Sequence, residues 1–470
     1  MNSFGFRRRR RVALVLVPAL AGTLLAAVGP AAPARAAEGG DLVIANVLWR
    51  VAVGSRPDLM TTNNPAERDQ FPVDGQTHYV PKYSGSGRSA LYRLHNPNWY
   101  GGSDHMDSRT AGEAGFGTEY ALGYPYTSQA AGTQPYLRTF NGCTGDHGTR
   151  SQNEGAKPCY GDEAGGHGYA WPRYLNTATS LASLSAGGVT ISSNRVTGGA
   201  LWNWTYDGTQ YINNLDYGRQ LQSSLFFSRD GVTANPTEAG DTWSNPAWPA
   251  YRRHGSPLLA LNTDAASKTQ STRSMPIDFV PQNFGGGEQN PAIYRDFQLG
   301  KDITLDWGGL GPVARYQTVL NSPALTYPGI EVPTAYLRAE FNRYFTYDAV
   351  SQTLTERTNF GQCSDASYFS WTPPNRGGVI IANADLTKAM AVYGANTSQG
   401  GSVSEMRMYK FIGGGCGTGT GEFDIASSKF TVLRHGNVGA GEKRFNSWVM
   451  TGSVGQIQGW MNTLRSWGAA

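Results

Sequence analysis

The stretch Leu91–Ser108, LYRLHNPNWYGGSDHMDS, decides how the first part of the chain folds, because versions of it occur on both sides of it. It places an Arg in a strand-like opening and an Asp-His pair eleven residues later. One further copy begins at Leu48 and another at Tyr136. A stretch that recurs in this way is the unit of a structural repeat.

The three copies carry the same residue types in the same order. Their opening arginines are spaced 43 and 45 residues apart. An aromatic-containing segment closes each copy: HYVPKY, GYPYTS and GYAWPRY. A fixed period of this size, built from short strands and Gly-rich turns, predicts a pseudo-threefold, β-trefoil-like module over residues 41–174. The shared positions are Arg50, Arg93 and Arg138; Asp58, Asp104 and Asp146; Leu59, His105 and His147; and Glu67, Glu113 and Glu154.

The repeated polar residues are expected to be structural, because a catalytic site rarely occurs in three copies. Hydrogen bonds and ion pairs between strand and loop would then hold each unit together. The alternative is a repeated sugar pocket in which Tyr or Trp provides a stacking platform. Five of the seven His lie in this region, but their spacing follows the repeat and not a ligand pattern such as HExxH, so no metal site is predicted.

These segments resemble a repeat of unknown function found in many secreted microbial proteins, often beside hydrolases, with the approximate pattern "lyR-h-n... DHfyT... E... GY". The match covers about Asp41 to Tyr174, and the first copy departs from it at Asp58-Leu59. The resemblance implies a binding or targeting module and implies no chemistry.

The composition indicates an all-β chain. The 470 residues include 60 Gly, 25 Pro, 24 Tyr and 12 Trp, only 16% are charged, and few long runs have helical period. Such a composition favours many strands and turns. We therefore expect the module to be followed by a linker, residues 175–186, and a large antiparallel β-sandwich, residues 187–467.

The N-terminus is typical of a secretory signal peptide over residues 1–36. Arg7 to Arg11 precede the apolar run Val12 to Ala27, and Ala34-Arg35-Ala36 fits a small-x-small cleavage site. The arginine run suits either the general or the twin-arginine export route. Removing the six arginines of this segment, which has no acid, lowers the formal charge from +4 to −2. The mature chain therefore gives no argument for nucleic-acid binding.

The four cysteines predict two disulfides, because an exported chain meets an oxidising environment. Pairing of nearest neighbours gives Cys143–Cys159 and Cys363–Cys416. The spacing contains no CxxC, which argues against a zinc knuckle.

The second domain resembles galactose-mutarotase-like β-sandwiches of the supersandwich type. In that group a pattern "GG.i..w...dG...N..D.GR.iq" recurs, and Gly198–Phe227 reads GGALWNWTYDGTQYINNLDYGRQLQSSLFF. The blocks NPTEAGD, SMPIDFVPQNF and EVPTAYLRAEFNRYFTYD fit the same layout. The family's epimerases use a His base together with a Glu, and this sequence offers no residue-by-residue match for that pair.

Candidate site residues gather in and after this stretch. Polar side chains inside a β-prone run must pair with each other, with water or with a ligand. Aromatic rings beside them suit sugars, because a ring stacks on the C–H face while charged groups bind hydroxyls. The catalytic candidates are Asp216, Arg219, Glu238, Asp241 and His254, and the substrate-binding candidates are Trp202, Trp204, Asn213, Asn214, Tyr217 and Trp243.

Two chemistries remain open for these residues. A glycoside hydrolase needs two carboxyl groups about 5–5.5 Å or about 6.5–9.5 Å apart. A polysaccharide lyase needs a base and a group that neutralises a uronate, roles for Tyr217, Arg219 and His254. Structural roles compete at every position, among them an Asp216–Arg219 ion pair. Glu331 and Glu340 flank a helix-like piece, TAYLRAEF, and are expected to be solvated.

The sequence thus predicts a secreted, extracellular, monomeric protein that recognises polysaccharide or cell-wall glycan and needs no cofactor. Cleavage of the glycan by the second domain, as a hydrolase or a lyase, is one hypothesis. A non-catalytic glycan-binding or cell-envelope protein is the other. Neither nucleic acid nor, after signal cleavage, a membrane is an expected partner.

Overall fold

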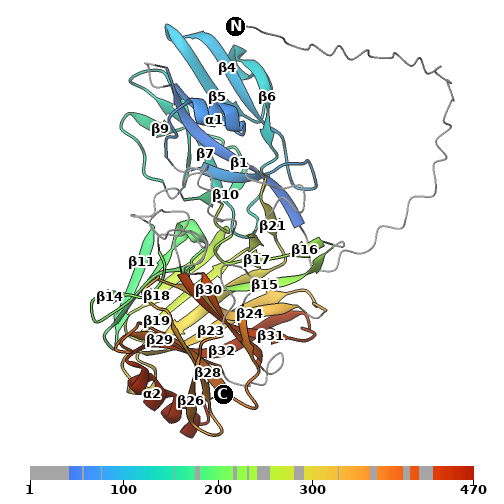
Figure 1. The fold of residues 1–470 in the computed structure, drawn as a ribbon. Helices are drawn as coiled ribbons and strands as arrows, with labels where there is room; N and C mark the ends of the chain where they lie inside the picture. Colours follow the sequence, from blue (N-terminus) through green and yellow to red (C-terminus); the bar gives the residue numbers. More distant parts are fainter. Residues whose placement is uncertain are drawn as a thin grey trace, which may run out of the picture. The chain divides into compact units, whose positions relative to one another are not determined.

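The computed structural model describes most of the chain that follows the predicted signal peptide (Figure 1). The predicted signal peptide lies outside the described residues. Residues 37–470 form one unit. The described residues are 42–54, 58–75, 77–152, 154–174, 180–214, 220–229, 232–240, 254–279, 290–326, 328–359, 368–394, 403–411 and 427–469.

The repeat module consists of short antiparallel strands. In the second copy, Leu91–Trp99 pairs on one side with Gly102–Ser108 and on the other with Gly117–Gly123. The first and third copies repeat this arrangement of an Arg-bearing strand with shorter partners. The strands are β1 (Leu42–Val53), β2 (Asp58–Thr62), β3 (Thr77–Pro81), β4 (Leu91–Trp99), β5 (Gly102–Ser108), β6 (Gly117–Gly123), β7 (Gln134–Asn141), β8 (His147–Ser151), β9 (Tyr160–Asp162) and β10 (Tyr169–Arg173).

The repeated arginines are buried, and each is neutralised by the Glu of the preceding copy in a closed ring. Arg93, 4% exposed, donates from both terminal nitrogens to Glu67, at 2.6 and 3.0 Å. Each arginine also pairs with an acid of its own copy and donates to a backbone carbonyl of the preceding one. The ring pairs Arg50 with Glu154, Arg93 with Glu67 and Arg138 with Glu113.

A second ring runs through the repeated aspartates. Asp58 accepts from the backbone N–H of His105 at 3.1 Å and lies 2.8 Å from its Nδ1. Asp104 holds His147 in the same way, at 2.9 and 2.5 Å. Asp146 closes the ring by accepting from the N–H of Leu59 at 3.1 Å. Leu59 stands where the other copies have His and has no side-chain donor. The hydroxyl of Tyr160 donates to Asp146 in its place.

Both rings agree with the predicted pseudo-threefold arrangement and with a structural role for its polar residues. Each arginine forms the expected ion pair within its own copy, and the structure adds a second pair that joins each copy to the preceding one. The geometry of these second pairs needs all three copies at once. The resemblance to the secreted repeat remains a prediction.

Local sequence explains how the first copy positions Glu67. Asn64 caps the short helix α1 (Pro65–Gln70) by accepting from the N–H of Ala66, and Pro65 stands at the first helical position, where its missing N–H costs nothing. The helix thereby fixes Glu67 beside Arg93. In the third copy, the predicted disulfide Cys143–Cys159 is confirmed, with Cα atoms 5.9 Å apart. Cys363 and Cys416 lie outside the described residues.

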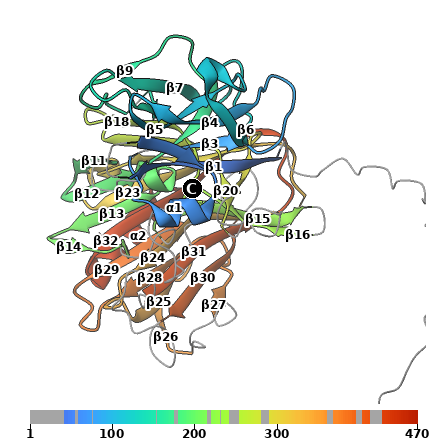
Figure 2. The same cartoon turned by 90° about the horizontal axis from the view of Figure 1, so that it is seen from above.

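The following residues build an all-β sandwich from two large antiparallel sheets, as expected. One sheet has the order β18-β19-β22-β23-β32-β29-β28-β25-β26. Figure 2 shows β32, β29, β28 and β25 side by side. Its strands are β18 (Leu258–Asp264), β19 (Thr269–Ser274), β22 (Gln298–Thr304), β23 (Val313–Ser322), β25 (Arg343–Asp348), β26 (Thr353–Arg357), β28 (Gly377–Ala382), β29 (Ala389–Gly394) and β32 (Gly441–Gly452).

The opposing sheet runs in the order β27-β30-β31-β24-β15-β17-β20-β21, and β16 pairs with β15. At its end, Leu42–Ile44 of β1 pairs with β21, so the repeat module and the sandwich share this sheet. Its strands are β15 (Gln222–Arg229), β16 (Val232–Ala234), β17 (Pro236–Thr237), β20 (Ile277–Asp278), β21 (Ala292–Tyr294), β24 (Gly329–Leu337), β27 (Tyr368–Trp371), β30 (Val403–Phe411) and β31 (Ser427–His435).

The predicted linker, residues 175–186, is wrong in part, because its second half belongs to a third, smaller sheet. Residues 175–179 lie outside the described residues, but Leu181–Ala186 forms strand β11 and pairs with β12 (Val189–Asn194). The sheet continues through β13 (Leu201–Tyr206) and β14 (Thr209–Gln210). Among the described residues, short 3₁₀ turns lie at Glu113–Gly115, Arg195–Thr197 and Trp307–Gly309.

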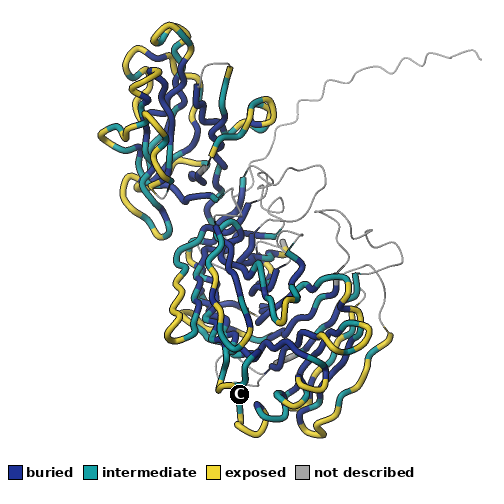
Figure 3. The backbone as a smooth tube through the Cα atoms, turned by 90° about the vertical axis from the view of Figure 1, so that its left-hand side faces the viewer, coloured by how far each residue is buried: buried dark blue, intermediate teal, exposed yellow. Residues whose placement is uncertain are grey.

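The large core lies between the two sheets of the sandwich and contains Met406, Met408, Phe430 and Val432 from one sheet. In Figure 3 the buried residues, in dark blue, run through the inner segments of the tube, and exposed residues, in yellow, gather at its turns. The nine-stranded sheet buries its other face under helix α2 (Val454–Ser466), through Ile457, Met461 and Leu464. Ser453 and Gln456 form a capping box at the start of that helix. None of the helices among the described residues has the length and apolar character to cross a bilayer.

The arginine ring yields a stability prediction. Replacing Arg93 by Met leaves Glu67 and Glu119 without their buried cation. We expect the free energy of unfolding to fall by about 3–5 kcal/mol, the usual cost of breaking a buried ion pair. Denaturant unfolding of the mature protein measures it. Arg343→Met, which breaks an exposed pair with Glu356, is the control and should change stability little. Equal stability of both variants would show that the ring does not hold the module together.

Candidate functional site

Several predicted site residues lie outside the described residues, so their roles remain predictions. This applies to the catalytic candidates Asp216, Arg219 and Asp241 and to the substrate-binding candidates Tyr217 and Trp243. The predicted Asp216–Arg219 pair falls in the same group.

Glu238 is described, and it lies in a closed polar network inside the sandwich. It is 0% exposed and accepts from the Nζ of Lys301 at 3.0 Å and from the backbone N–H of Ser223 at 2.7 Å. Lys301 uses its remaining protons on Gly199 O and Thr272 Oγ1, at 2.7 and 3.1 Å. Burial lowers the pKa of Lys301, although Glu238 opposes this. A carboxylate whose partners are all fixed is built for structure, so this placement does not favour catalysis.

The other described candidates also differ from the expected cluster. Trp204 is 0% exposed in the core and donates to Thr451 Oγ1 at 3.2 Å, so it offers no open face for a sugar. His254 is 0% exposed, and burial lowers its pKa well below its ordinary value, which leaves it neutral. His254 therefore lies inside the protein and not at its surface. Asn213 is buried, whereas Asn214, which donates to Asn203 at 2.8 Å, and Trp202 are partly exposed.

A different set of polar and aromatic residues lies on the side of β24, β27, β30 and β31 that faces away from the large core. Along β30, Met406 and Met408 enter the core while Glu405, Arg407 and Tyr409 alternate with them. β31 repeats the pattern around Phe430 and Val432. We call this set the aromatic–ionic face. Its residues are Glu331, Tyr336, Tyr368, Ser370, Glu405, Arg407, Tyr409, Phe411, Lys429 and His435.

Strand register brings these side chains into rows. Tyr368 lies opposite Tyr409, Tyr409 opposite Lys429, and Lys429 opposite Tyr336. The Tyr368 and Tyr409 rings are 5.3 Å apart, and Phe411 lies 5.9 Å from Tyr409 and 6.0 Å from Tyr336. One row therefore combines three tyrosines and a lysine across four strands.

An ion pair lies within the aromatic row. The Nζ of Lys429 is 3.1 Å from Glu331, whose other oxygen accepts from Ser224 Oγ at 2.7 Å. The ammonium also lies 4.8 Å from the ring centre of Tyr409 and 5.2 Å from that of Tyr336. Burial alone would lower the pKa of Lys429, but Glu331 and the two tyrosines outweigh it and raise that pKa. The lysine is therefore charged at neutral pH.

A second carboxylate lies on the next row. Glu405 forms an ion pair with Arg407 and accepts from Ser370 Oγ at 2.7 Å, and the Nε2 of His435 is 4.0 Å away. Burial raises the pKa of Glu405, but Arg407 and Ser370 outweigh it and lower that pKa. The carboxylate is therefore ionised at neutral pH.

Glu331 and Glu405 share the aromatic–ionic face with one strand between them. Both lie opposite Leu433 of β31, one on each side. Two strand spacings separate their Cα atoms by roughly 9–10 Å. The face thus presents two fixed carboxylates, two fixed cations and several aromatic rings, a combination that can bind a polar ligand with apolar faces.

Sequence reasoning missed most of this face. TAYLRAEF was taken for a helix-like piece, but Thr334–Leu337 belongs to β24, and Glu331 is 8% exposed, not solvated. Glu340 is exposed, as expected. The signal that could have found the face is the alternation in EMRMY and KFTV, where Met406, Met408, Phe430 and Val432 alternate with charged, aromatic or polar residues.

Comparisons with known proteins give similarity to solved structures only. No family model and no curated protein matches this chain. A "putative aldose 1-epimerase" from Klebsiella pneumoniae covers 63% of this chain and 87% of its own, with 8% identity and a TM-score of 0.37. The 4-alpha-glucanotransferase from Thermococcus litoralis covers 58% of this chain and 37% of its own, with 10% identity and a TM-score of 0.30.

A third similar structure is the heparan sulfate lyase HepC from Pedobacter heparinus. It covers 56% of this chain and 33% of its own, with 6% identity and a TM-score of 0.29. Similarities this low carry no argument about substrate or reaction.

The Glu238 network yields a second prediction. In Glu238→Gln, Lys301 keeps a buried charge without a counter-ion, so we expect the free energy of unfolding to fall by about 3–5 kcal/mol. Glu238→Leu combined with Lys301→Met removes both charges and should recover part of this loss. Glu340→Gln, at an exposed position, is the control. Thermal and denaturant unfolding measure all three. Unchanged stability together with lost glycan turnover would instead assign Glu238 to catalysis.

Proposed function

We propose that this is a secreted, extracellular protein that recognises a polysaccharide through the aromatic–ionic face of its sandwich. The observation that carries the proposal is the row of Tyr336, Tyr368 and Tyr409 around the ion pair Glu331–Lys429. The charged side chains of an ordinary solvated sheet face are mobile, and few aromatic rings pack between them. The charged side chains of the aromatic–ionic face are held in place by their partners.

The chemistry of the face matches that of sugars. A tyrosine ring is apolar on its face and polar at its tip, so it can stack on the C–H side of a pyranose and bind a hydroxyl. Carboxylates accept hydroxyl protons, and Lys429 and Arg407 donate to hydroxyl or carboxylate oxygens. Because internal partners fix these groups, little side-chain entropy is lost when the ligand binds.

Two features support an extracellular location. The N-terminal segment has the charged start, apolar run and small-x-small site of an export signal. The disulfide Cys143–Cys159 suits an oxidising compartment.

The binding proposal predicts that Tyr368→Ala weakens retention on a polysaccharide about tenfold, equivalent to about 1.4 kcal/mol. Tyr368 is the most exposed aromatic residue of the face, 36%, so its loss should not unfold the protein. Affinity electrophoresis through gels containing plant, fungal or bacterial cell-wall polysaccharides measures the effect. The matched control is Tyr83→Ala, at a tyrosine of the repeat module that is 60% exposed. Equal retention of both variants would refute a role for this face.

Cleavage is a second candidate function, and the placement of Glu331 and Glu405 on one face favours it. Inverting glycosidases hold their two carboxyl groups about 6.5–9.5 Å apart, a spacing that side chains on strands two apart can reach. A general acid must be protonated at the working pH, however, and both carboxylates have cationic partners. Recognition therefore has the stronger support.

Product analysis separates the two functions. If the face cleaves glycans, mature protein should release reducing ends, and Glu405→Gln should abolish their release while retaining binding. New reducing ends without unsaturated product would indicate a hydrolase, and both together a lyase. Glu340→Gln, at an exposed position outside the face, is the control. Retention of a polymer that is never shortened would leave recognition as the function.

A further inference from the structure

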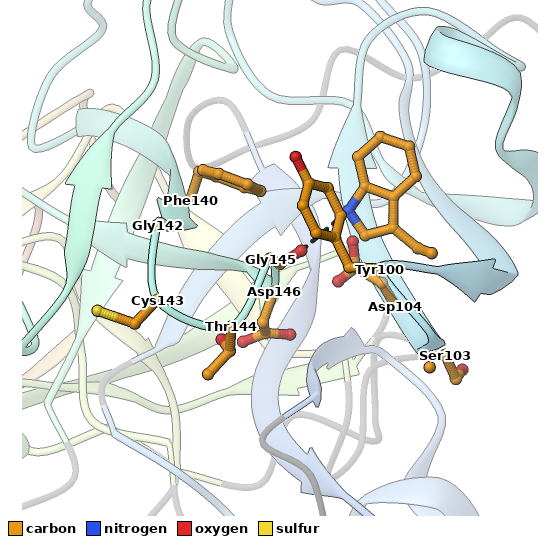
Figure 4. Close-up of a pocket in the computed structure, with 11 residues that line it drawn as sticks. Tyr100, Ser103, Asp104, Phe140, Gly142, Cys143, Thr144, Gly145 and Asp146 are labelled. Carbon is orange, nitrogen blue, oxygen red and sulfur yellow. Dashed lines mark hydrogen bonds between the residues drawn. The ribbon is translucent and has the colours of Figure 1, made fainter.

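A pocket of about 480 Å³ opens in the repeat module, between the second and third copies (Figure 4). Trp99, Tyr100 and Phe140 line it with aromatic rings, and Asp104 and Asp146 line it with carboxylates. Neither Lys nor Arg is among the described residues that line it. It is separate from the aromatic–ionic face and does not depend on the function proposed for that face.

The aromatic part of the pocket is held in place. The Nε1 of Trp99 donates to the carbonyl of Gly145 at 2.9 Å, a bond drawn in Figure 4. The Tyr100 ring lies 5.3 Å from Trp99 and 6.3 Å from Phe140, so the three rings form an arc. Gly145 packs so closely that a Cβ there would lie 2.6 Å from the Tyr100 ring.

Tyr100 occupies a backbone position that does not suit it. Trp99 pairs with Gly102, so Tyr100 and Gly101 are the two central residues of the β4–β5 hairpin. Their φ angles are +46° and +76°, as in the type I′ turn, where Asn-Gly is the favoured pair. For a residue with a bulky side chain, this conformation costs about 1–2 kcal/mol. Tyr100 is also 69% exposed, so burial does not explain why a large ring stands there.

The carboxylates concentrate negative charge at the base of the pocket. Oxygens of Asp58, Asp104 and Asp146 lie within 4.8 Å of one another, and all three residues are buried. The partners of Asp104 and Asp146 named above are backbone N–H groups, the His147 ring and the Tyr160 hydroxyl, none of them a Lys or Arg. Burial, together with Asp104 and Asp58, raises the pKa of Asp146 to about 7. A positive charge in the pocket would relieve this repulsion.

We propose that this pocket binds an organic ammonium group, with the cation against the rings of Trp99, Tyr100 and Phe140 and its charge facing Asp104 and Asp146. Aromatic rings attract cations through their electron-rich faces, and carboxylates add a Coulombic attraction. The described lining offers no Lys or Arg to a phosphate, a sulfate or a uronate, so an ammonium group fits it better. The group can belong to a quaternary amine of the choline type or to the protonated amine of an amino sugar.

The test compares choline with 3,3-dimethylbutan-1-ol, which has the same shape and no charge. Calorimetric titration of the mature protein at pH 8 should show choline binding at least about tenfold tighter than the neutral isostere. A glucosamine hexamer and its N-acetylated counterpart form the second arm, titrated beside choline at about pH 6.5, because amino-sugar amines are largely deprotonated at pH 8. Tighter binding of the hexamer than of choline assigns the site to amino sugars, and the reverse assigns it to quaternary amines. Equal affinity for choline and its isostere overturns the proposal.

Tyr100→Asn is the informative variant, because Asn suits the turn and the ring is lost. Choline affinity should fall at least about tenfold while the melting temperature stays at or above that of the parent. Tyr83→Asn is the control and should bind choline normally. If Tyr100→Asn retains full affinity, the rings are not the site. A calcium titration that raises the melting temperature, with no effect of choline, would also overturn the proposal in favour of a metal site.

The pH profile adds a readout that a purely apolar pocket would lack. Choline keeps its charge at every pH, so only the protein titrates. Asp146 faces Asp58 of β2, Asp104 of β5 and the hydroxyl of Tyr160 of β9. As the pH falls from 8 through about 7 to 5, Asp146 takes up a proton and choline affinity should decrease. A pH-independent affinity would contradict the role given to Asp146.

Discussion

A buried charge must have a partner, and this constraint shapes the protein from end to end. In the repeat module, each buried Arg pairs with one acid of its own copy and with the Glu of the preceding copy. Every Glu of the repeat therefore has its buried cation only when the ring is closed. The sandwich obeys the same constraint with Glu238–Lys301 inside and Glu331–Lys429 at the sheet surface.

The Glu238–Lys301 pair has a structural role, whereas the Glu331–Lys429 pair belongs to the candidate functional site, and their surroundings explain the difference. Around Glu238, the described donors come from strands and turns that are themselves buried, and the network has no open side. Around Glu331, the aromatic rings of Tyr336 and Tyr409 flank the lysine, and the row continues to the exposed Tyr368. A closed network stabilises the fold. A fixed pair that borders an accessible aromatic row can also receive a ligand.

The periodicity of the sequence predicted the repeat module, but the sequence did not predict the aromatic–ionic face, which depends on strand pairing. The repeat could be aligned because its Arg, Asp and Glu recur in order, and the Cys143–Cys159 bond followed from proximity in the chain. Glu331, Glu405 and Lys429 are far apart in sequence, and only the register of three strands places them on one face. TAYLRAEF was mistaken for a helix because its helix-favouring residues outweighed a pairing that local sequence does not record. Trp204 was misplaced for a related reason, since an aromatic residue in an alternating strand can face either side.

Two residues of the repeat module, Leu59 and Tyr100, break its threefold symmetry, and each has a physical explanation. Leu59 stands where the other copies have His, and Tyr160 of the third copy supplies the missing donor to Asp146. Tyr100 stands in a hairpin position that favours Asn, and it lies over the pocket that Asp146 lines. The first departure lies where the third copy meets the first, and only Tyr100 lies at the pocket between the second and third copies. The rings do not depend on Tyr100, because neither ring uses its side chain. A scaffold that is stable through its repeated contacts can tolerate such a residue in one turn, and selection for a ligand gives a reason to keep it there.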